Sequence, residues 1–217
     1  MFRANEQWMS DRRPDKKGCL ISIEGIDGAG KSTQIRMLGE WLRANGIDAA
    51  MLKEPTDGLY GREIRDNAAA HRPVSPQEEM RLFMMDRKED VAKNIRPALD
   101  AGKVVVMDRY YQSNMAYQGA RGLDPWQIEA ENERFSPVPD LVIVLDIDPA
   151  HGLSRITNTR KTALDSFEKE DYLRKVRDIF LAIGRKPNGV IIDAERPPAA
   201  VHESIVRAIK ERLPGIF

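Results

Sequence analysis

Five short apolar runs, separated by longer segments with helical periodicity, constrain the fold of this chain more than any other feature. The runs are CLISIEGI (19–26), AAMLKE (49–54), KVVVMD (103–108), LVIVLDID (141–148) and GVIID (189–193). Three of them are continuously apolar rather than alternating, as expected for strands that are covered on both faces. Strands that alternate with helices predict an α/β fold of three αβα layers, in which helices flank a five-stranded parallel sheet.

Composition fits a single soluble domain. The 217 residues suit one domain, and 34 Lys and Arg residues balance 34 Asp and Glu residues. The absence of net charge argues neither for nor against a nucleic-acid partner, and any anion site must be a local cluster of basic groups. We expect no nucleic-acid partner. The lone cysteine, Cys19, is expected to be buried, excludes an internal disulfide and fits the reducing cytoplasm. No run is long enough to span a membrane. Residues 1–18 are polar and are expected to be a poorly ordered extension before a domain of residues 19–217.

The segment GIDGAGKST, residues 25–33, follows the first apolar run and opens a segment with helical spacing. It satisfies the phosphate-loop pattern G-x-x-x-x-G-K-[ST] through Gly25, Gly30, Lys31 and Ser32. Glycines let backbone N–H groups point at phosphate oxygens, the lysine reaches the β- and γ-phosphates, and the serine hydroxyl suits Mg²⁺. The expected ATP-binding residues are Gly25, Ile26, Asp27, Gly28, Ala29, Gly30, Lys31, Ser32 and Thr33.

An acidic residue inside this loop needs a separate explanation. The carboxylate of Asp27 repels phosphates, so it is expected to face a sugar hydroxyl or a metal-bound water. The alternative is a turn aspartate that only contacts solvent. The loop by itself indicates a nucleoside triphosphate and leaves the reaction open.

Two further stretches lie where predicted strands end, EPTDG (54–58) and DRYYQSNMAYQGARG (108–122). With IEGIDGAGKST, LFMMDRKE and PDLVIVLDIDPAHGLSRI in the same order, they make the chain resemble the thymidylate kinase family from Cys19 to the C-terminus. The resemblance implies a P-loop nucleoside monophosphate kinase that uses ATP and Mg²⁺ to convert dTMP to dTDP in dTTP synthesis. It also implies a homodimer, to which the Met- and Leu-rich helical segment 78–85 would contribute.

The resemblance also implies roles for individual residues. Those implied for dTMP are Asp27, Glu54, Phe83, Arg87, Arg109, Ser113, Asn114, Tyr117 and Gln118. Those implied for catalysis are Lys31, Arg109, Arg160, Asp27 and Arg155, and those for the metal, partly through water, are Ser32, Asp108 and Glu168. Phe83 and Arg87 share a helix face. In the resemblance, the Phe83 ring would stack on thymine and Arg87 would reach its exocyclic oxygen. The Arg109 guanidinium would hold the acceptor phosphate through paired N–H bonds. Glu54 is expected to orient either Arg109 or Arg87.

Several arginine assignments stay open. A short lid at about 155–168 is expected to supply the charge-stabilising arginine, with Arg160 placed before Arg155. Arg121 is either a phosphate contact or an exposed loop residue. Some relatives carry an arginine near EPTDG, and here Arg62 either substitutes for it or lies on a helix surface.

Two other functions remain as alternatives. One is a kinase for dUMP, another deoxynucleotide or a nucleoside. Phe83, Arg87, Asn114 and Tyr117 favour thymidylate, and a nucleoside would leave Arg109 without its phosphate. The other is a regulatory P-loop ATPase that binds a macromolecule and only hydrolyses ATP. The balanced charge and the second phosphate-binding arginine argue against it.

Overall fold

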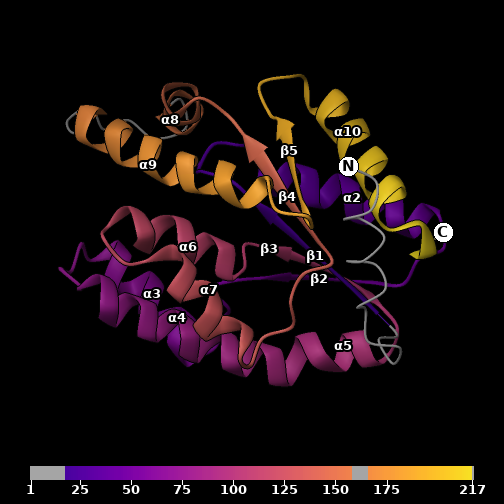
Figure 1. The fold of residues 1–217 in the computed structure, drawn as a ribbon, viewed down its shortest axis with the longest axis horizontal. Helices are drawn as coiled ribbons and strands as arrows, with labels where there is room; N and C mark the ends of the chain where they lie inside the picture. Colours follow the sequence, from indigo (N-terminus) through magenta and orange to yellow (C-terminus); the bar gives the residue numbers. More distant parts are fainter. Residues whose placement is uncertain (1–17, 158–165, 217) are drawn as a thin grey trace.

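A five-stranded parallel sheet forms the centre of the protein (Figure 1). The structure, a computed structural model, describes residues 18–157 and 166–216, without the side chains of Thr157 and residues 166–169. The strands are β1 (Cys19–Glu24), β2 (Ala49–Lys53), β3 (Val104–Asp108), β4 (Leu141–Asp146) and β5 (Gly189–Asp193), in the order β2-β3-β1-β4-β5. The predicted αβα fold is therefore confirmed. All the predicted extension except Gly18 lies outside the described residues.

Helices cover both faces of the sheet (Figure 1). In chain order they are α2 (Lys31–Ala44), α3 (Leu59–Ala69), α4 (Pro76–Asp90), α5 (Arg96–Asp100), α6 (Tyr111–Ala120), α7 (Pro125–Glu133), α8 (Pro149–Thr157), α9 (Ser166–Gly184) and α10 (Pro198–Arg212), with a 3₁₀ turn at Pro214–Ile216. Helices α2 and α10 pack together on one face, while α5, α6 and α9 lie on the other. None of the helices among the residues described has both the length and the apolar character to cross a membrane.

The core follows from the continuous apolar runs. In β1 the side chains of Leu20, Ile21 and Ile23 are fully buried, as expected for a central strand covered on both faces. Cys19, expected to be buried, is instead half-buried at the start of β1 and packs against the core. The strands thus form a rigid platform whose carboxyl ends all point to one edge.

The helical region between α3 and β3 is not one continuous α-helix. It begins after Ser75, whose hydroxyl accepts a hydrogen bond from the Glu78 N–H. A π-helical turn at Val91–Ile95 then separates α4 from α5. Pro97 lies at the start of α5, and its ring would clash with the carbonyl four residues earlier in a regular helix. The wider π turn removes that conflict.

Two helical glycines give a test of how closely α3 packs on the loop after β2. A Cβ at Gly61 would lie 1.9 Å from the Thr56 carbonyl oxygen, whereas a Cβ at Gly39 in α2 would meet only the Met51 side chain, at 3.5 Å or more. We expect Gly61→Ala to lower the free energy of unfolding by about 1–3 kcal/mol through overpacking. Gly39→Ala should raise it by about 0.5–1 kcal/mol, because alanine favours a helix. Urea denaturation measures both. Equal effects would contradict the described contact.

Candidate active site

The ends of β1 and β3 place two functional segments side by side. The strands are parallel, with Ile23 opposite Asp108. The phosphate loop therefore leaves the sheet next to the turn that carries Arg109, and the backbone N–H of Arg109 donates to the Ile23 carbonyl at 3.2 Å. The two segments are separated by more than 80 positions in the sequence, and sheet register alone brings them together.

Glycine is required at two positions of the loop. Gly28 has a φ of 83°, and a Cβ there would lie 2.2 Å from the Gly152 carbonyl oxygen. Gly25 has a φ of 141°, and a Cβ there would lie 2.5 Å from the Leu145 carbonyl oxygen. The loop passes directly into α2 at Lys31, so the free N–H groups of the first helical turn face the same site. Ser32 and Thr33 are exposed in that turn.

Lys31 is a buried cation held by the loop itself. Its side chain is 9% exposed, and its Nζ donates to the carbonyl oxygens of Gly25 at 3.0 Å and Ile26 at 2.9 Å. Burial, helped by the nearby charge of Arg109, lowers the pKa of Lys31 to about 7 although the carboxylate of Asp27 opposes the shift. The ammonium group is thus positioned for phosphate but only partly protonated near neutral pH.

Arg109 connects the loop with a neighbouring cavity. It has a left-handed φ of 68°. Its Nη1 donates to the Ser113 hydroxyl at 3.0 Å and, at 3.3 Å, to the Gly25 carbonyl, while its Nη2 lies 2.5 Å from the Asp27 carboxylate and 3.3 Å from the Tyr117 hydroxyl. The guanidinium also lies 5.1 Å from the centre of the Tyr117 ring. Asp27 is 61% exposed, so this ion pair borders solvent.

A cavity of about 380 Å³ opens beside Arg109. All nine residues that the resemblance implied for dTMP line it: Asp27, Glu54, Phe83, Arg87, Arg109, Ser113, Asn114, Tyr117 and Gln118. Arg121, left open in the sequence analysis, also lines it, and sequence reasoning missed the other lining residues, which are Pro55, Ile64, Arg65, Ala68, Glu79, Tyr110 and Tyr172. The size is suitable for a small ligand such as a mononucleotide.

A buried ion pair lies at the end of the cavity away from the loop. Glu54 and Arg87 are 2% and 1% exposed, and the Glu54 carboxylate accepts from Nε at 2.8 Å and from Nη2 at 2.5 Å of the guanidinium. Of the two open partners, Glu54 therefore orients Arg87 and not Arg109. Burial raises the pKa of Glu54 to about 7, although the charge of Arg87 opposes the rise. Arg87 also donates to the side-chain oxygen of Asn132 at 2.6 Å.

From this pair a chain of hydrogen bonds runs along the cavity wall. Arg87 Nη2 donates to Asn114 Oδ1 at 2.7 Å, and Asn114 Nδ2 donates to Gln118 Oε1 at 3.0 Å. Gln118 Nε2 then donates to the Glu79 carboxylate at 2.9 Å. Arg121, left open as a phosphate contact, is paired with the same Glu79 carboxylate. Every side chain in the chain is therefore held by at least one neighbour.

Aromatic side chains complete the cavity. Phe83 is half-buried on α4 and lines the wall. The Tyr117 ring packs edge-on against Tyr172, at 6.4 Å between centroids, and Phe180, at 6.1 Å. These edge contacts fix the plane of Tyr117 and leave little freedom for it to move away from Arg109.

The remaining predicted arginines lie at different places. Arg155, at the end of α8, donates to the carbonyl oxygens of Gly28 at 3.3 Å and Ala194 at 3.2 Å, so it reaches the phosphate loop. Arg160, the side chain of Glu168 and most of the predicted lid lie outside the described residues. Arg62 is an exposed residue of α3 that does not line the cavity, which fits its surface interpretation. Arg65, one turn later, does line it.

One missed residue had a signal in the sequence. Glu79, Phe83 and Arg87 are spaced by four, so they share one face of α4 and all line the cavity. The motif LFMMDRKE begins at Leu82, so it contains Phe83 and Arg87 but not Glu79. Arg65 and Tyr172 carry no such signal, since they lie on α3 and α9, outside the motifs.

The possible metal ligands are oxygen atoms only. Ser32 and Asp108 lie at the phosphate loop and at the end of β3, and the Asp108 carboxylate accepts no hydrogen bond from the residues that the structure describes. No group of three His, Cys, Asp or Glu residues within the described ranges could hold an ion by itself. This donor set excludes a closed structural zinc site there and fits Mg²⁺, which keeps waters and substrate phosphates as ligands.

A parallel sheet of this order, with a glycine-rich loop between its central strand and the following helix, defines the P-loop NTPase fold, and the cavity beside Arg109 adds a second nucleotide-sized site. Comparison with known proteins narrows the class further. The family model described as "Thymidylate kinase" matches residues 23–205. The chain therefore belongs to the thymidylate kinase family.

Individual relatives agree over most of their length. A "Probable thymidylate kinase" of Archaeoglobus fulgidus is 45% identical over 194 residues, covering 89% of this chain and 96% of the relative. A "Thymidylate kinase" of Akkermansia muciniphila is 44% identical over 203 residues, covering 94% and 97%. One from Desulfotalea psychrophila is 48% identical over 163 residues, covering 75% and 80%.

The lowered pKa of Lys31 predicts that nucleotide binding takes up a proton. The phosphates favour the ammonium form, so binding should raise the pKa from about 7. Well below pH 7 the group is already charged and no uptake follows. At about pH 8 it is mostly neutral, so close to one proton should be taken up, and affinity for ATP should fall as pH rises. Calorimetry in buffers of different ionisation enthalpy measures the uptake. Lys31→Gln should abolish it, and equal uptake in both proteins would contradict the assignment.

Proposed function

We propose that this protein is a dTMP kinase that transfers the γ-phosphoryl group of ATP to the 5′-phosphate of dTMP, giving ADP and dTDP for dTTP synthesis. One observation carries the proposal. Arg109 contacts the phosphate loop at Gly25 and Asp27 and also lines the cavity beside it, so donor and acceptor phosphates would meet at one guanidinium. Family membership supports the same activity.

The cavity offers groups that suit thymine. Phe83 provides an aromatic face for the base. Arg87 has five N–H groups, and the four hydrogen bonds described above leave one N–H on Nη1 without a partner among the described residues. We assign that N–H to the exocyclic oxygen of thymine. Asn114 Oδ1 has a second lone pair for the ring N–H, and Tyr117, beside Arg109, would crowd a ribose 2′-hydroxyl.

Transfer requires cations more than covalent chemistry. A phosphate oxygen of dTMP attacks the γ-phosphorus of ATP, a new P–O bond forms, and the bond to the β-phosphate oxygen breaks to release ADP. Arg109 would hold the acceptor phosphate, and Lys31 would neutralise the transferring group. Arg155 reaches the phosphate loop at Gly28 and is proposed to assist. Asp27 would release Arg109 to the acceptor phosphate and face the sugar.

Mg²⁺ is the proposed cofactor, held by Ser32 and Asp108, with Glu168 assigned from the resemblance. When bound, it would neutralise the phosphate oxygens of ATP. Because the oxygen donors come from two loops that meet at the sheet edge, the same register that positions Arg109 also positions them. The alternative functions, a nucleoside kinase or a regulatory ATPase, would leave Arg109 without an acceptor phosphate to bind.

A panel of nucleoside monophosphates tests the function. With ATP and Mg²⁺, we expect dTMP to yield its diphosphate with the highest kcat/KM, ahead of dUMP, dCMP and ribothymidine monophosphate. Chromatographic detection of the diphosphate separates transfer from hydrolysis. ATP hydrolysis with no phosphorylated acceptor would replace the proposal with a regulatory ATPase, and preference for another acceptor would change the substrate.

Variants of Tyr117 provide the matched control for this panel. Tyr117→Ala removes the ring and should narrow the ratio of dTMP to ribothymidine monophosphate turnover. The change should be modest, on the order of tenfold, because crowding rejects an added hydroxyl weakly. Tyr117→Phe keeps the ring and should keep the ratio. If both variants retain the ratio, the ring does not select the sugar.

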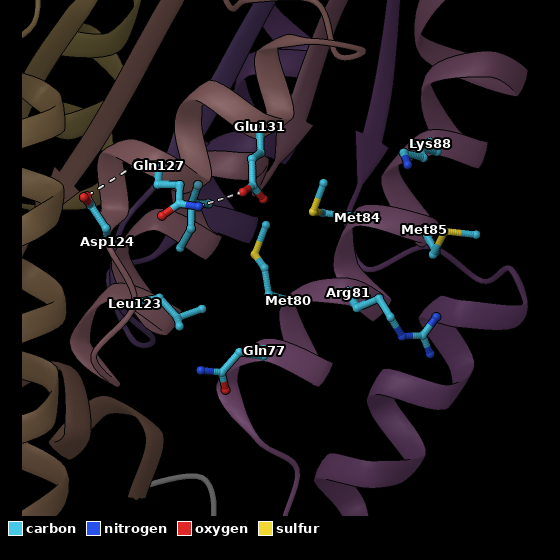
Figure 2. A pocket seen from close by; sticks show the side chains of 11 residues that line it. Gln77, Met80, Arg81, Met84, Met85, Lys88, Leu123, Asp124, Gln127 and Glu131 are labelled. Atoms are coloured by element: carbon cyan, nitrogen blue, oxygen red, sulfur yellow. Dashed lines mark hydrogen bonds between the residues drawn. The ribbon is translucent and has the colours of Figure 1, made fainter.

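We also propose a homodimer through a groove between α4 and α7. Figure 2 shows Met80 and Met84 lying between the two elements, and the groove has a volume of about 370 Å³. Basic residues of α4, Arg81 and Lys88, border one side, while the acidic Glu131 of α7 borders the other. A second copy related by a two-fold axis would set these opposite charges against each other across an apolar centre.

Sedimentation equilibrium tests this arrangement. We expect a dimer at micromolar concentration, and Met84→Glu should weaken association by at least about tenfold, because a carboxylate would be buried without a partner. Met51→Glu is the matched control, since Met51 on β2 is 38% exposed and lies outside the groove. A monomer, or equal effects of the two substitutions, would contradict the proposed interface.

A further inference from the structure

Glu24, the last residue of β1, is a fully buried carboxylate that does not line the cavity. It accepts three hydrogen bonds. Oε1 accepts from the Ser22 hydroxyl at 2.8 Å and from the Tyr110 backbone N–H at 2.8 Å, and Oε2 accepts from the Ser113 hydroxyl at 2.6 Å. Two of the three donors lie next to Arg109. Tyr110 follows it in the chain, and the Ser113 hydroxyl contacts its side chain.

The backbone contact holds a strained turn. Arg109 has a φ of 68°, and a left-handed conformation is unfavourable for a residue with a side chain. Two hydrogen bonds fix the peptides around it, from Arg109 N–H to the Ile23 carbonyl and from Tyr110 N–H to Glu24. The first belongs to the sheet, whereas the second depends on a side chain. Glu24 is therefore the only side-chain acceptor that the described residues show for this turn.

The second contact fixes the direction of a hydroxyl. Ser113 donates its single proton to Glu24 Oε2, so its oxygen is left to accept from Arg109 Nη1 at 3.0 Å. A donor in place of Oε2 would force that proton towards the guanidinium, where two donors would oppose each other. Glu24 thus fixes both the backbone and the side chain of Arg109.

We infer that Glu24 is the positioning residue that holds Arg109 ready for the acceptor phosphate without touching either nucleotide. The inference rests on the proposed function. Replacement of Glu24 by glutamine tests the inference with little change of side-chain volume. Its single carbonyl oxygen can serve either the Tyr110 N–H or the Ser113 hydroxyl, and its NH₂ group opposes the other. One of the two supports of Arg109 is lost in either orientation.

Kinetics of three variants form the first test. Glu24→Gln should raise the KM for dTMP on the order of 10-fold to 100-fold, as expected for a misplaced binding group, while the KM for ATP changes little. Ser113→Ala removes the side-chain link to Arg109, together with any contact of Ser113 itself with dTMP, and should also raise the KM for dTMP. Ser22→Ala is the matched control, because it removes a hydrogen bond of the same carboxylate but has no link to Arg109. Thermal unfolding confirms that each variant is folded.

Crystallography of Glu24→Gln gives a readout that does not depend on activity. We expect the Arg109 guanidinium to leave Ser113, or its φ to leave the left-handed region. If the Arg109 turn and side chain superpose on the unaltered protein, or if Glu24→Gln and Ser22→Ala have equal kinetics, Glu24 is not a positioning residue. Failure of the unaltered chain to phosphorylate dTMP would overturn the proposed function instead, and the crystallographic result would still decide the role of Glu24.

Discussion

The parallel pairing of β1 with β3 is the constraint on which the site depends. Because Ile23 lies opposite Asp108, both strands end at the same level of the sheet. The loop after one strand and the turn after the other must then share one edge, with the Arg109 side chain between them. Neither segment could form this site alone. A phosphate loop without β3 beside it would lack the Arg109 side chain and the cavity next to it.

Three cations that the described residues bring to this edge are held by oxygen atoms of the protein. Lys31 is held by carbonyls of the phosphate loop, Arg109 by a carbonyl and a carboxylate of the same loop, and Arg155 by a loop carbonyl and Ala194. These contacts keep the positive charges close together in spite of their mutual repulsion. Burial, and after it the nearby charge of Arg109, lowers the pKa of Lys31.

The sequence predicted the sheet and the phosphate loop, because each depends on local patterns or on a motif. The nine residues implied for dTMP all line one cavity, and their role in binding stays a prediction. The sequence allowed a helix surface for Arg62 but gave no bounds for α3, in which only Gly61 and Ile64 are buried, so that the helix lacks an apolar stripe. The π turn before Pro97 was also missed, since the helical spacing continues across it. Glu24 acts through contacts with Tyr110 and Ser113, which are far away in the sequence, and no local pattern marks such contacts. Which partner Glu54 orients was likewise decided only by the fold.

The hydrogen-bond chain from Arg87 to Glu79 has a direction. A guanidinium can only donate and a carboxylate can only accept, so the two amides between them, Asn114 and Gln118, must both point the same way. Reversing either amide would create mismatched pairs at both of its ends. Two charged residues on one face of α4 thereby impose a single polarity on the opposite wall formed by α6. The orientation of both amides in the cavity wall is therefore set by the charged groups at the two ends of the chain, and any ligand in the cavity would face that fixed order of donors and acceptors.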